Sequence, residues 1–359
     1  MLNDINKILK FGAHGVAVSF IILTFFLFKT NSLVHEVFLC NCLPFYSSNI
    51  NFDLNNNKNF LIYKNKENNK KKIENKSSKS KHKKNKEVFN LSNNLNKINF
   101  SSLGLENLYD LDYLKKNFYA CDENTELTCD DLNIKKIIDF NPAIDIKTDG
   151  PKILIFHTHS TEMFCDSNEE NIFDGVVGLG RELNNILNKK YKIKTIHDIS
   201  RYDLIDGKAD KRGAYDRMEE NVNNIIKNNP SIEISIDIHR DGVDSKKNMS
   251  INLNEKRTAK LMLVNGLCRL KKDNKLEKID YLSNKYIENN LAFSFKFQVL
   301  ANKIYPDLMR KVYIKPYRYS LNMLPKSLLI EVGAQTNTKE EALNSIYPLA
   351  DILTNLILE

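Results

Sequence analysis

Three histidines and two glutamates stand at or just after apolar runs of the kind that form buried strands. His157, His159 and Glu162 follow the run ILIF, His239 follows ISIDI, and Glu331 follows LLI. Imidazole nitrogens and carboxylate oxygens are the ligands that catalytic zinc takes, with one position kept for water. A single histidine is more often a surface or polar-core residue, but three of them at strand ends favour a metal site. No H-E-x-x-H pair is present, so a zincin helix is not indicated.

Glu331 has a role of its own in this hypothesis. A carboxylate at a strand end beside a metal would act as general base on a water and then protonate the leaving amine. The structural alternative is that Glu331 caps the next helix or pairs with Arg318.

Charged residues flank His239 on both sides. Asp237 and Asp241 are candidates to orient an imidazole, as carboxylates beside metal-ligating histidines commonly do. Their alternative is ordinary ion pairing with Arg240 or Arg212. Arg240 is also a candidate to stabilise an oxyanion.

The elements that must position these residues alternate between strand and helix after Pro151. This pattern predicts an α/β domain with a mainly parallel, twisted sheet flanked by helices, in which sites gather at the carboxyl ends of strands. The expected strands are 152–157, 192–197, 232–239, 260–266, 311–315 and 327–333, and the expected helices are 176–191, 214–229, 279–305 and 339–359.

Strand alternation assigns faces to the candidate residues. Asp237 and His239 should share the face opposite to the isoleucines of the same strand, because successive side chains point to opposite sides. His157 and His159 should share a side if the first strand stays extended that far.

The N-terminal part has a different character. Residues 1–10 precede the apolar segment Phe11–Phe28, which contains no acidic or basic residue apart from His14 and sits at the lower limit for spanning a bilayer. Lys7 and Lys10 before it favour a cytoplasmic N-terminus and an exported remainder. A cleaved signal peptide is the alternative, but no small-x-small site follows the run, so we expect an uncleaved transmembrane anchor.

Residues 47–100 are dominated by Asn, Lys and Ser and predict a disordered linker. Lys58 to Glu87 holds 12 Lys and 3 Glu, a charge of +9, so the rest of the chain carries 8 − 9 = −1. The excess is local, which argues against a folded domain that binds nucleic acid. The linker is either a solvated tether or one that also touches anionic lipid or wall polymer.

Residues 101–150 form a poorly defined lead-in to the catalytic domain expected at 151–359. The six cysteines contain no paired C-x-x-C motifs, so a cysteine-based zinc site is not indicated. Cys121 and Cys129 bracket a short loop and form either a disulfide or two free thiols.

Three motifs, in order, resemble the stage II sporulation protein P family of endospore-forming bacteria: ILIFHTHSTEMF, SIDIHRDG and LLIEVGAQTNTKEEALNS, with HDISRYDLIDGKADKRGAYDRM between the first two. The resemblance covers about Pro151 to Leu358. It implies an amidase-like fold and a peptidoglycan hydrolase of forespore engulfment, related to the zinc N-acetylmuramoyl-L-alanine amidases. It further implies cleavage of the muramoyl–L-alanine amide and of peptide cross-links, in the space between the forespore and mother-cell membranes. The stage II sporulation proteins D and M are the implied partners.

The resemblance also implies roles for single residues. His159 matches the first zinc ligand, with His157 as its rival, and His239 matches the histidine of the middle strand. Glu331 matches the catalytic glutamate, and Glu162, inside the family's own H-T-H-x-x-E motif, is the expected glutamate ligand.

Two features of the sequence complicate this transfer. The related amidases usually take their glutamate ligand from the start of the first helix, and here only Glu169 and Glu170 lie close before it. Ser320 and Leu321 stand where the family often has Asn-Gln, which puts substrate contacts near that loop in doubt. The rival hypotheses are a non-catalytic, peptidoglycan-binding scaffold with the same fold and a metallopeptidase that acts on proteins.

Overall fold

The computed structural model describes residues 103, 105–273 and 275–358, all of which belong to the second of two compact units, Ser78–Glu359. The expected anchor at 11–28 and the whole of the expected linker at 47–100 lie outside the described residues. Within the described ranges, no helix is long and apolar enough to cross a membrane. The anchor therefore stays a prediction.

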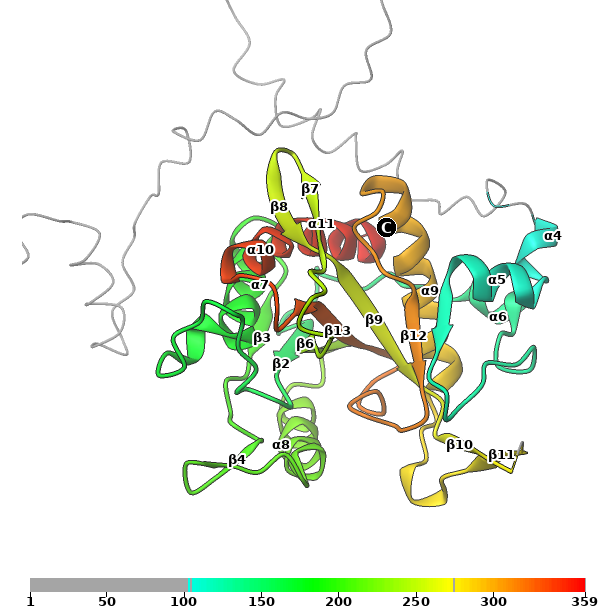
Figure 1. Ribbon diagram of the computed structural model, residues 1–359, viewed down its shortest axis with the longest axis horizontal. Helices are drawn as coiled ribbons and strands as arrows, with labels where there is room; N and C mark the ends of the chain where they lie inside the picture. The colour runs from blue at the N-terminus through cyan, green and yellow to red at the C-terminus, as the bar shows by residue number, and fades with distance from the viewer. Residues whose placement is uncertain (1–102, 104, 274, 359) are drawn as a thin grey trace, which may run out of the picture. The chain divides into compact units, whose positions relative to one another are not determined.

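A seven-stranded sheet in the order β1-β12-β9-β13-β6-β2-β3 forms the centre of this unit (Figure 1). All neighbouring strands are parallel except β9 and β13, which are antiparallel. The expected α/β class with a mainly parallel sheet is thereby confirmed. The strands are β1 (Tyr119–Cys121), β2 (Ile153–Phe156), β3 (Thr195–His197), β6 (Ile234–Asp241), β9 (Leu261–Gly266), β12 (Val312–Lys315) and β13 (Lys326–Ala334).

Register brings the carboxyl ends of the three central strands to one edge. Glu331 of β13 lies opposite His239 of β6, and Phe156 of β2 lies opposite Asp237 of β6. Because β2, β6 and β13 run in the same direction, the residues that follow each strand meet at this edge.

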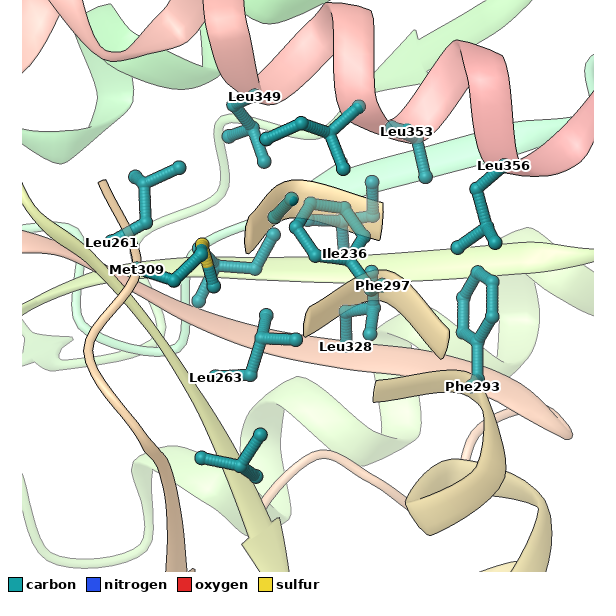
Figure 2. Close-up of a cluster of buried hydrophobic side chains, with 14 of the residues drawn as sticks. Ile236, Leu261, Leu263, Phe293, Phe297, Met309, Leu328, Leu349, Leu353 and Leu356 are labelled. Atoms are coloured by element: carbon teal, nitrogen blue, oxygen red, sulfur yellow. The ribbon is translucent and has the colours of Figure 1, made fainter. Parts of the chain in front are cut away.

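Helices cover the two faces of the sheet unequally. One face packs on a large apolar core with α7 (Val176–Lys189), α9 (Ile287–Ile304) and α11 (Ile346–Ile357), and the other packs on α8 (Ala214–Asn228). The isoleucines of β6 point into the large core, so its Asp237 and His239 occupy the α8 side, as alternation predicts. Figure 2 shows part of that core, with Ile236, Leu261, Leu263, Phe293, Phe297, Met309, Leu328, Leu349, Leu353 and Leu356.

The segment expected to be a poorly defined lead-in contributes to this architecture. It contains α4 (Leu105–Leu108), α5 (Leu111–Asn117) and α6 (Ile134–Asp139), and its strand β1 pairs with β12 at the edge of the sheet. The Lys296 ammonium of α9 donates hydrogen bonds to the carbonyls of Ile138 and Phe140, at the end of α6. The sheet and its core therefore begin well before residue 151.

The C-terminal helix differs from the single helix expected at 339–359. It is divided at Ser345 into α10 (Lys339–Asn344) and α11, and the Ser345 hydroxyl donates to the carbonyl of Ala259. Pro348 explains the break, because a proline is tolerated only in the first turn of a helix. A new helix therefore has to start close before it.

Two more details differ from the sequence-based expectations. The helix expected from residue 279 begins at Ile287, after the short 3₁₀ turn Asp280–Leu282. The four cysteines that the structure describes are free thiols, Cys121 and Cys129 among them. Three small hairpins complete the unit: β4 (Leu204–Ile205) with β5 (Lys208–Ala209), β7 (Ser250–Leu253) with β8 (Lys256–Ala259), and β10 (Arg269–Lys272) with β11 (Lys275–Lys278).

Candidate active site

The loop His157–Glu162 leaves β2 and is held by two buried carboxylates. Thr158 donates to Asp237 from its backbone N–H, at 2.9 Å, and from its hydroxyl, at 2.6 Å. The Ser160 hydroxyl donates to Asp203 at 2.7 Å, and Thr161 donates to the same carboxylate from its N–H and its hydroxyl. Ordered in this way, the loop presents the remaining residues, His159 and Glu162, in a defined arrangement.

Asp203 is a site residue that sequence reasoning missed. Its carboxylate is fully buried, and the hydrogen bonds from Thr161 and Ser160 outweigh burial and hold its pKa below its usual value. Nothing in the spacing of the segment distinguishes Asp203 from the acidic residues around it. Only the folded position under the loop identifies it.

His239 lies between two carboxylates. Its Nε2 is 2.8 Å from Oδ1 of Asp237, and its Nδ1 is 3.4 Å from Oε2 of Glu162. The Nε2 contact is close, but it lacks the alignment of a hydrogen bond. Burial alone would lower the pKa of His239, but the charges of Asp237 and Glu162 outweigh it and raise the pKa well above its usual value. The two acids therefore lie on either side of the His239 ring.

Glu162 is tied to the start of α7 as well as to His239. Its Oε2 accepts the N–H of Arg240 at 2.9 Å, and its backbone carbonyl accepts the N–H of Val176, the first residue of α7. The related amidases usually take a glutamate from the start of their first helix. Here Glu162 lies beside the start of α7, although it belongs to the loop after β2.

His159 stands next to His239 and His157 does not. The rings of His159 and His239 have centroids 5.4 Å apart and lie nearly perpendicular, and Nδ1 of His159 is buried without a hydrogen-bond partner among the described residues. Burial, followed by the charge of His239, lowers the pKa of His159. Nδ1 of this half-buried ring is therefore available to bind a ligand.

His157 points to the opposite face, toward α7. Its Nδ1 is 3.0 Å from the carbonyl of Ile238, its Nε2 is 2.9 Å from Nε2 of His197, and Gly180 of α7 lies against both rings. Burial lowers the pKa of His157 to about 4. The condition for His157 and His159 to share a side, a strand that stays extended through both, is not met, because the strand ends at Phe156.

Glu331 faces the same edge from β13. Burial raises its pKa to about 7; His239 opposes the shift, and Glu162 and Asp241 add to it. Its Oε2 is buried without a hydrogen-bond partner in the described part of the chain. Glu331 neither caps the next helix nor pairs with Arg318. Thr338 caps α10, and Arg318 forms an ion pair with Glu219.

Arg240 and Asp241 are engaged elsewhere. The Arg240 guanidinium donates from Nε to the carbonyl of Met163 at 3.0 Å and from Nη1 to its neighbour's carbonyl. Asp241 accepts a hydrogen bond from Arg310 at 2.6 Å and one from the N–H of Gly242. Neither contact involves an imidazole, so Asp237 is the one of the two aspartates that lies against His239.

Two tyrosines that sequence reasoning overlooked border His159. The Tyr215 ring, in the first turn of α8, meets the His159 ring edge to face with centroids 5.5 Å apart, and the Tyr319 ring meets Tyr215 at 5.6 Å. Tyr319 has φ 56°, an uncommon conformation for a bulky residue, which its surroundings must enforce. The loop after it is anchored where Asn284 and Asn290 donate to the carbonyl of Leu321.

The donor set matches the chemistry of a zinc site. Within the described ranges, no group of three or more His, Cys, Asp or Glu side chains is already arranged to hold a metal ion. Yet Nδ1 of His159 and Oε2 of Glu331 are buried without hydrogen-bond partners among the described residues. Such orphaned groups clustered at one edge are uncommon in native proteins and mark a place where a ligand completes the structure. Two imidazoles and the Glu162 carboxylate are ligand types that zinc prefers.

Two of the solved structures to which the chain is similar are amidases. The CwlD amidase of Clostridioides difficile, in complex with the GerS lipoprotein, is 14% identical with a TM-score of 0.35, covering 58% of this chain and 95% of that one. The N-acetylmuramoyl-L-alanine amidase AmiC2 of Nostoc punctiforme is 10% identical with a TM-score of 0.32, covering 57% and 97%. These similarities are too weak to carry an argument about chemistry.

A comparison with curated proteins finds no match. The family model of stage II sporulation protein P, by contrast, matches residues 36–354, which is most of the chain and includes the candidate site. The chain belongs to the stage II sporulation protein P family.

Proposed function

We propose that this protein is a sporulation peptidoglycan hydrolase that cleaves the amide between muramic acid and L-alanine, and also peptide cross-links. The observation that carries the proposal is the position of Glu331, whose pKa is raised to about 7, opposite His239 in the sheet. A carboxyl group with a pKa near neutrality can both accept and return a proton at physiological pH.

The proposed site would hold a zinc ion through His159, Glu162 and His239. When bound, zinc polarises a carbonyl and lowers the pKa of a water molecule. Asp237 orients His239 from behind, and Asp203 keeps the loop that carries His159 and Glu162 in place. Nitrogen from the substrate amide leaves after it has received a proton.

Glu331 would move that proton. It takes a proton from the attacking water, so that the water oxygen bonds to the carbonyl carbon, and delivers it to the amide nitrogen as the carbon–nitrogen bond breaks. The same sequence of steps hydrolyses either a muramoyl amide or a peptide bond, which is why both substrates belong to the proposal.

We further propose that the segment Phe11–Phe28 anchors the protein in the membrane with its N-terminus in the cytoplasm and its catalytic unit outside. This arrangement is supported by the composition of the segment and by the lysines that precede it. Stage II sporulation proteins D and M are the partners that we propose, because the chain belongs to this family.

The test is digestion of purified peptidoglycan by the full-length protein in detergent, with mass spectrometry of the fragments. Amidase activity releases peptides with a free N-terminal alanine, and endopeptidase activity converts cross-linked dimers into monomers. Both should disappear in Glu331→Gln and on removal of zinc by a chelator. Binding to peptidoglycan without any cleavage by the wild-type protein would instead support the scaffold hypothesis.

A further inference from the structure

Apart from the proposed zinc ion, the described residues named so far include no free hydrogen-bond donor for the negative charge that develops during amide hydrolysis. Attack of water on a carbonyl carbon shifts an electron pair to the carbonyl oxygen, and enzymes commonly stabilise that oxygen with a preorganised hydrogen-bond donor. Arg240 is unsuited to this role, because its guanidinium is bound to the carbonyls of Met163 and Asp241. Another donor has to be sought among the groups beside His159.

The Tyr215 hydroxyl is such a group. The Tyr215 ring lies against the ring of His159, on the side of the sheet that also holds Asp237 and His239. Among the described residues, its interactions are ring contacts with His159 and Tyr319, and its hydroxyl has no hydrogen-bond partner. The Tyr215 side chain is only partly buried, so its hydroxyl is available to a substrate group.

The ring is held firmly enough to serve as a preorganised group. Tyr215 belongs to the first turn of α8, and its ring packs edge to face against two others. The ring centroids of His159 and Tyr319 lie 5.5 Å and 5.6 Å from its own. Tyr319 is itself fixed in a strained backbone conformation, with φ 56°. Strain of this kind persists where the surroundings over-determine the position of a residue, and it is common at functional sites.

The hydroxyl needs no special environment to act as a donor. A tyrosine hydroxyl has an ordinary pKa of about 10, so it remains a hydrogen-bond donor across the physiological pH range.

We propose that Tyr215 is a further catalytic residue, whose hydroxyl donates a hydrogen bond to the oxygen of the scissile carbonyl as that oxygen becomes negative. The inference rests on the proposed function. The water oxygen forms a bond to the carbonyl carbon, its proton goes to Glu331, and the carbonyl π pair moves to the oxygen that faces Tyr215. When the carbon–nitrogen bond breaks, the pair returns to the carbonyl and the nitrogen takes the proton of Glu331. Tyr215 keeps its proton throughout.

The simpler interpretation is that Tyr215 only packs against His159. Tyr215→Phe separates the two, because it keeps the ring and removes only the hydroxyl. Tyr317→Phe is the matched control, since its ring meets the ring of Tyr319, its centroid 6.4 Å away, and its side chain is exposed. Both variants should retain the melting temperature and zinc content of the wild-type protein.

The experiment measures kcat and KM on a soluble muramoyl peptide with the full-length protein in detergent, and the Kd of a phosphonate mimic of the tetrahedral intermediate. We expect Tyr215→Phe to lose roughly 10²–10³-fold in kcat, the usual worth of one oxyanion donor, with little change in KM. Affinity for the phosphonate should fall with kcat. Tyr317→Phe should behave as wild type.

Four outcomes would overturn the inference. An unchanged kcat in Tyr215→Phe would reduce the residue to packing, and a raised KM with an unchanged kcat would limit it to substrate binding. Equal loss of kcat in both variants would point to the aromatic cluster and away from the hydroxyl. A wild-type protein that cleaves nothing would defeat the proposed function and this inference together, whereas an active wild type with an equally active Tyr215→Phe defeats the inference alone.

Discussion

The carboxylate of Asp203 accepts two hydrogen bonds from Thr161, one from its backbone N–H and one from its hydroxyl. Through this contact a segment that precedes α8 fixes the loop that follows β2. Because His159 and Glu162 belong to that loop, Asp203 governs the geometry of two proposed zinc ligands without touching either of them.

Asp203→Asn should therefore weaken zinc binding while the fold survives. Asparagine keeps the shape but replaces one acceptor oxygen with a donor, so at least one of the three hydrogen bonds is lost. By analogy with outer-shell changes at metal sites, we expect a decrease of about 10–100-fold in zinc affinity, measured by competition with a chelator. Asp206→Asn, in the same segment but exposed, is the control and should bind zinc as wild type does. Equal affinities in both variants would show that the loop needs no such support.

Glu331→Gln should separate metal binding from proton transfer. Glutamine has nearly the same shape but cannot accept a proton, so zinc content should remain while the amidase rate falls by roughly 10²–10⁴-fold. His239→Ala should lose both zinc and activity, because it removes a proposed ligand. Metal analysis and a muropeptide release assay on both variants provide the measurement. Near wild-type activity in Glu331→Gln would refute the proposed mechanism.

His159→Ala and His157→Ala should fail in different ways. His159 is placed beside His239, so its loss should abolish zinc binding with a small effect on stability. His157 is fully buried and bonded on both nitrogens, so its loss should lower the melting temperature while zinc binding is largely retained. Thermal melting and metal analysis test the pair, and loss of zinc in His157→Ala alone would reverse the assignment.

His197 should make the protein sensitive to acid. Burial, followed by the charges of His157 and Arg181, lowers its pKa from the usual value of 6.5 to about 3. Between these two pH values the unfolded chain binds a proton that the folded chain does not, so stability falls as the pH drops from about 6.5 toward 3. Glutamine does not titrate, so the melting temperature of His197→Gln should fall less than that of the wild-type protein between pH 7 and pH 5. The ordinary pKa of His lies between these two pH values. Parallel curves for the two proteins would argue against this role.

Sequence reasoning located most of the candidate site because strands and helices alternate clearly and because His239 and Glu331 end apolar runs. The alternation of β6 also assigned Asp237 and His239 to the same face, as the structure confirms. These inferences depend on local periodicity, which a single sequence displays.

The remaining features depend on where the chain turns and what it meets after folding. His157 and His159 lie on different sides of the sheet because the strand ends at Phe156. The apolar run in the sequence does not show at which residue the extended conformation ends. Asp203 and Tyr215 reach the site only through the placement of the segment before α8 and of α8 itself. No spacing in the sequence reports such long-range contacts.

The pairing of β1 with β12 has a practical consequence for anyone who cuts this protein into pieces. A fragment that starts at residue 151 would lack β1 and leave the backbone groups of β12 open along one side. Bare strand edges recruit other chains, so such a fragment should aggregate even though every proposed ligand is present. Residues 119–121 thus protect the exposed edge of β12, a strand that lies almost 200 residues later in the chain.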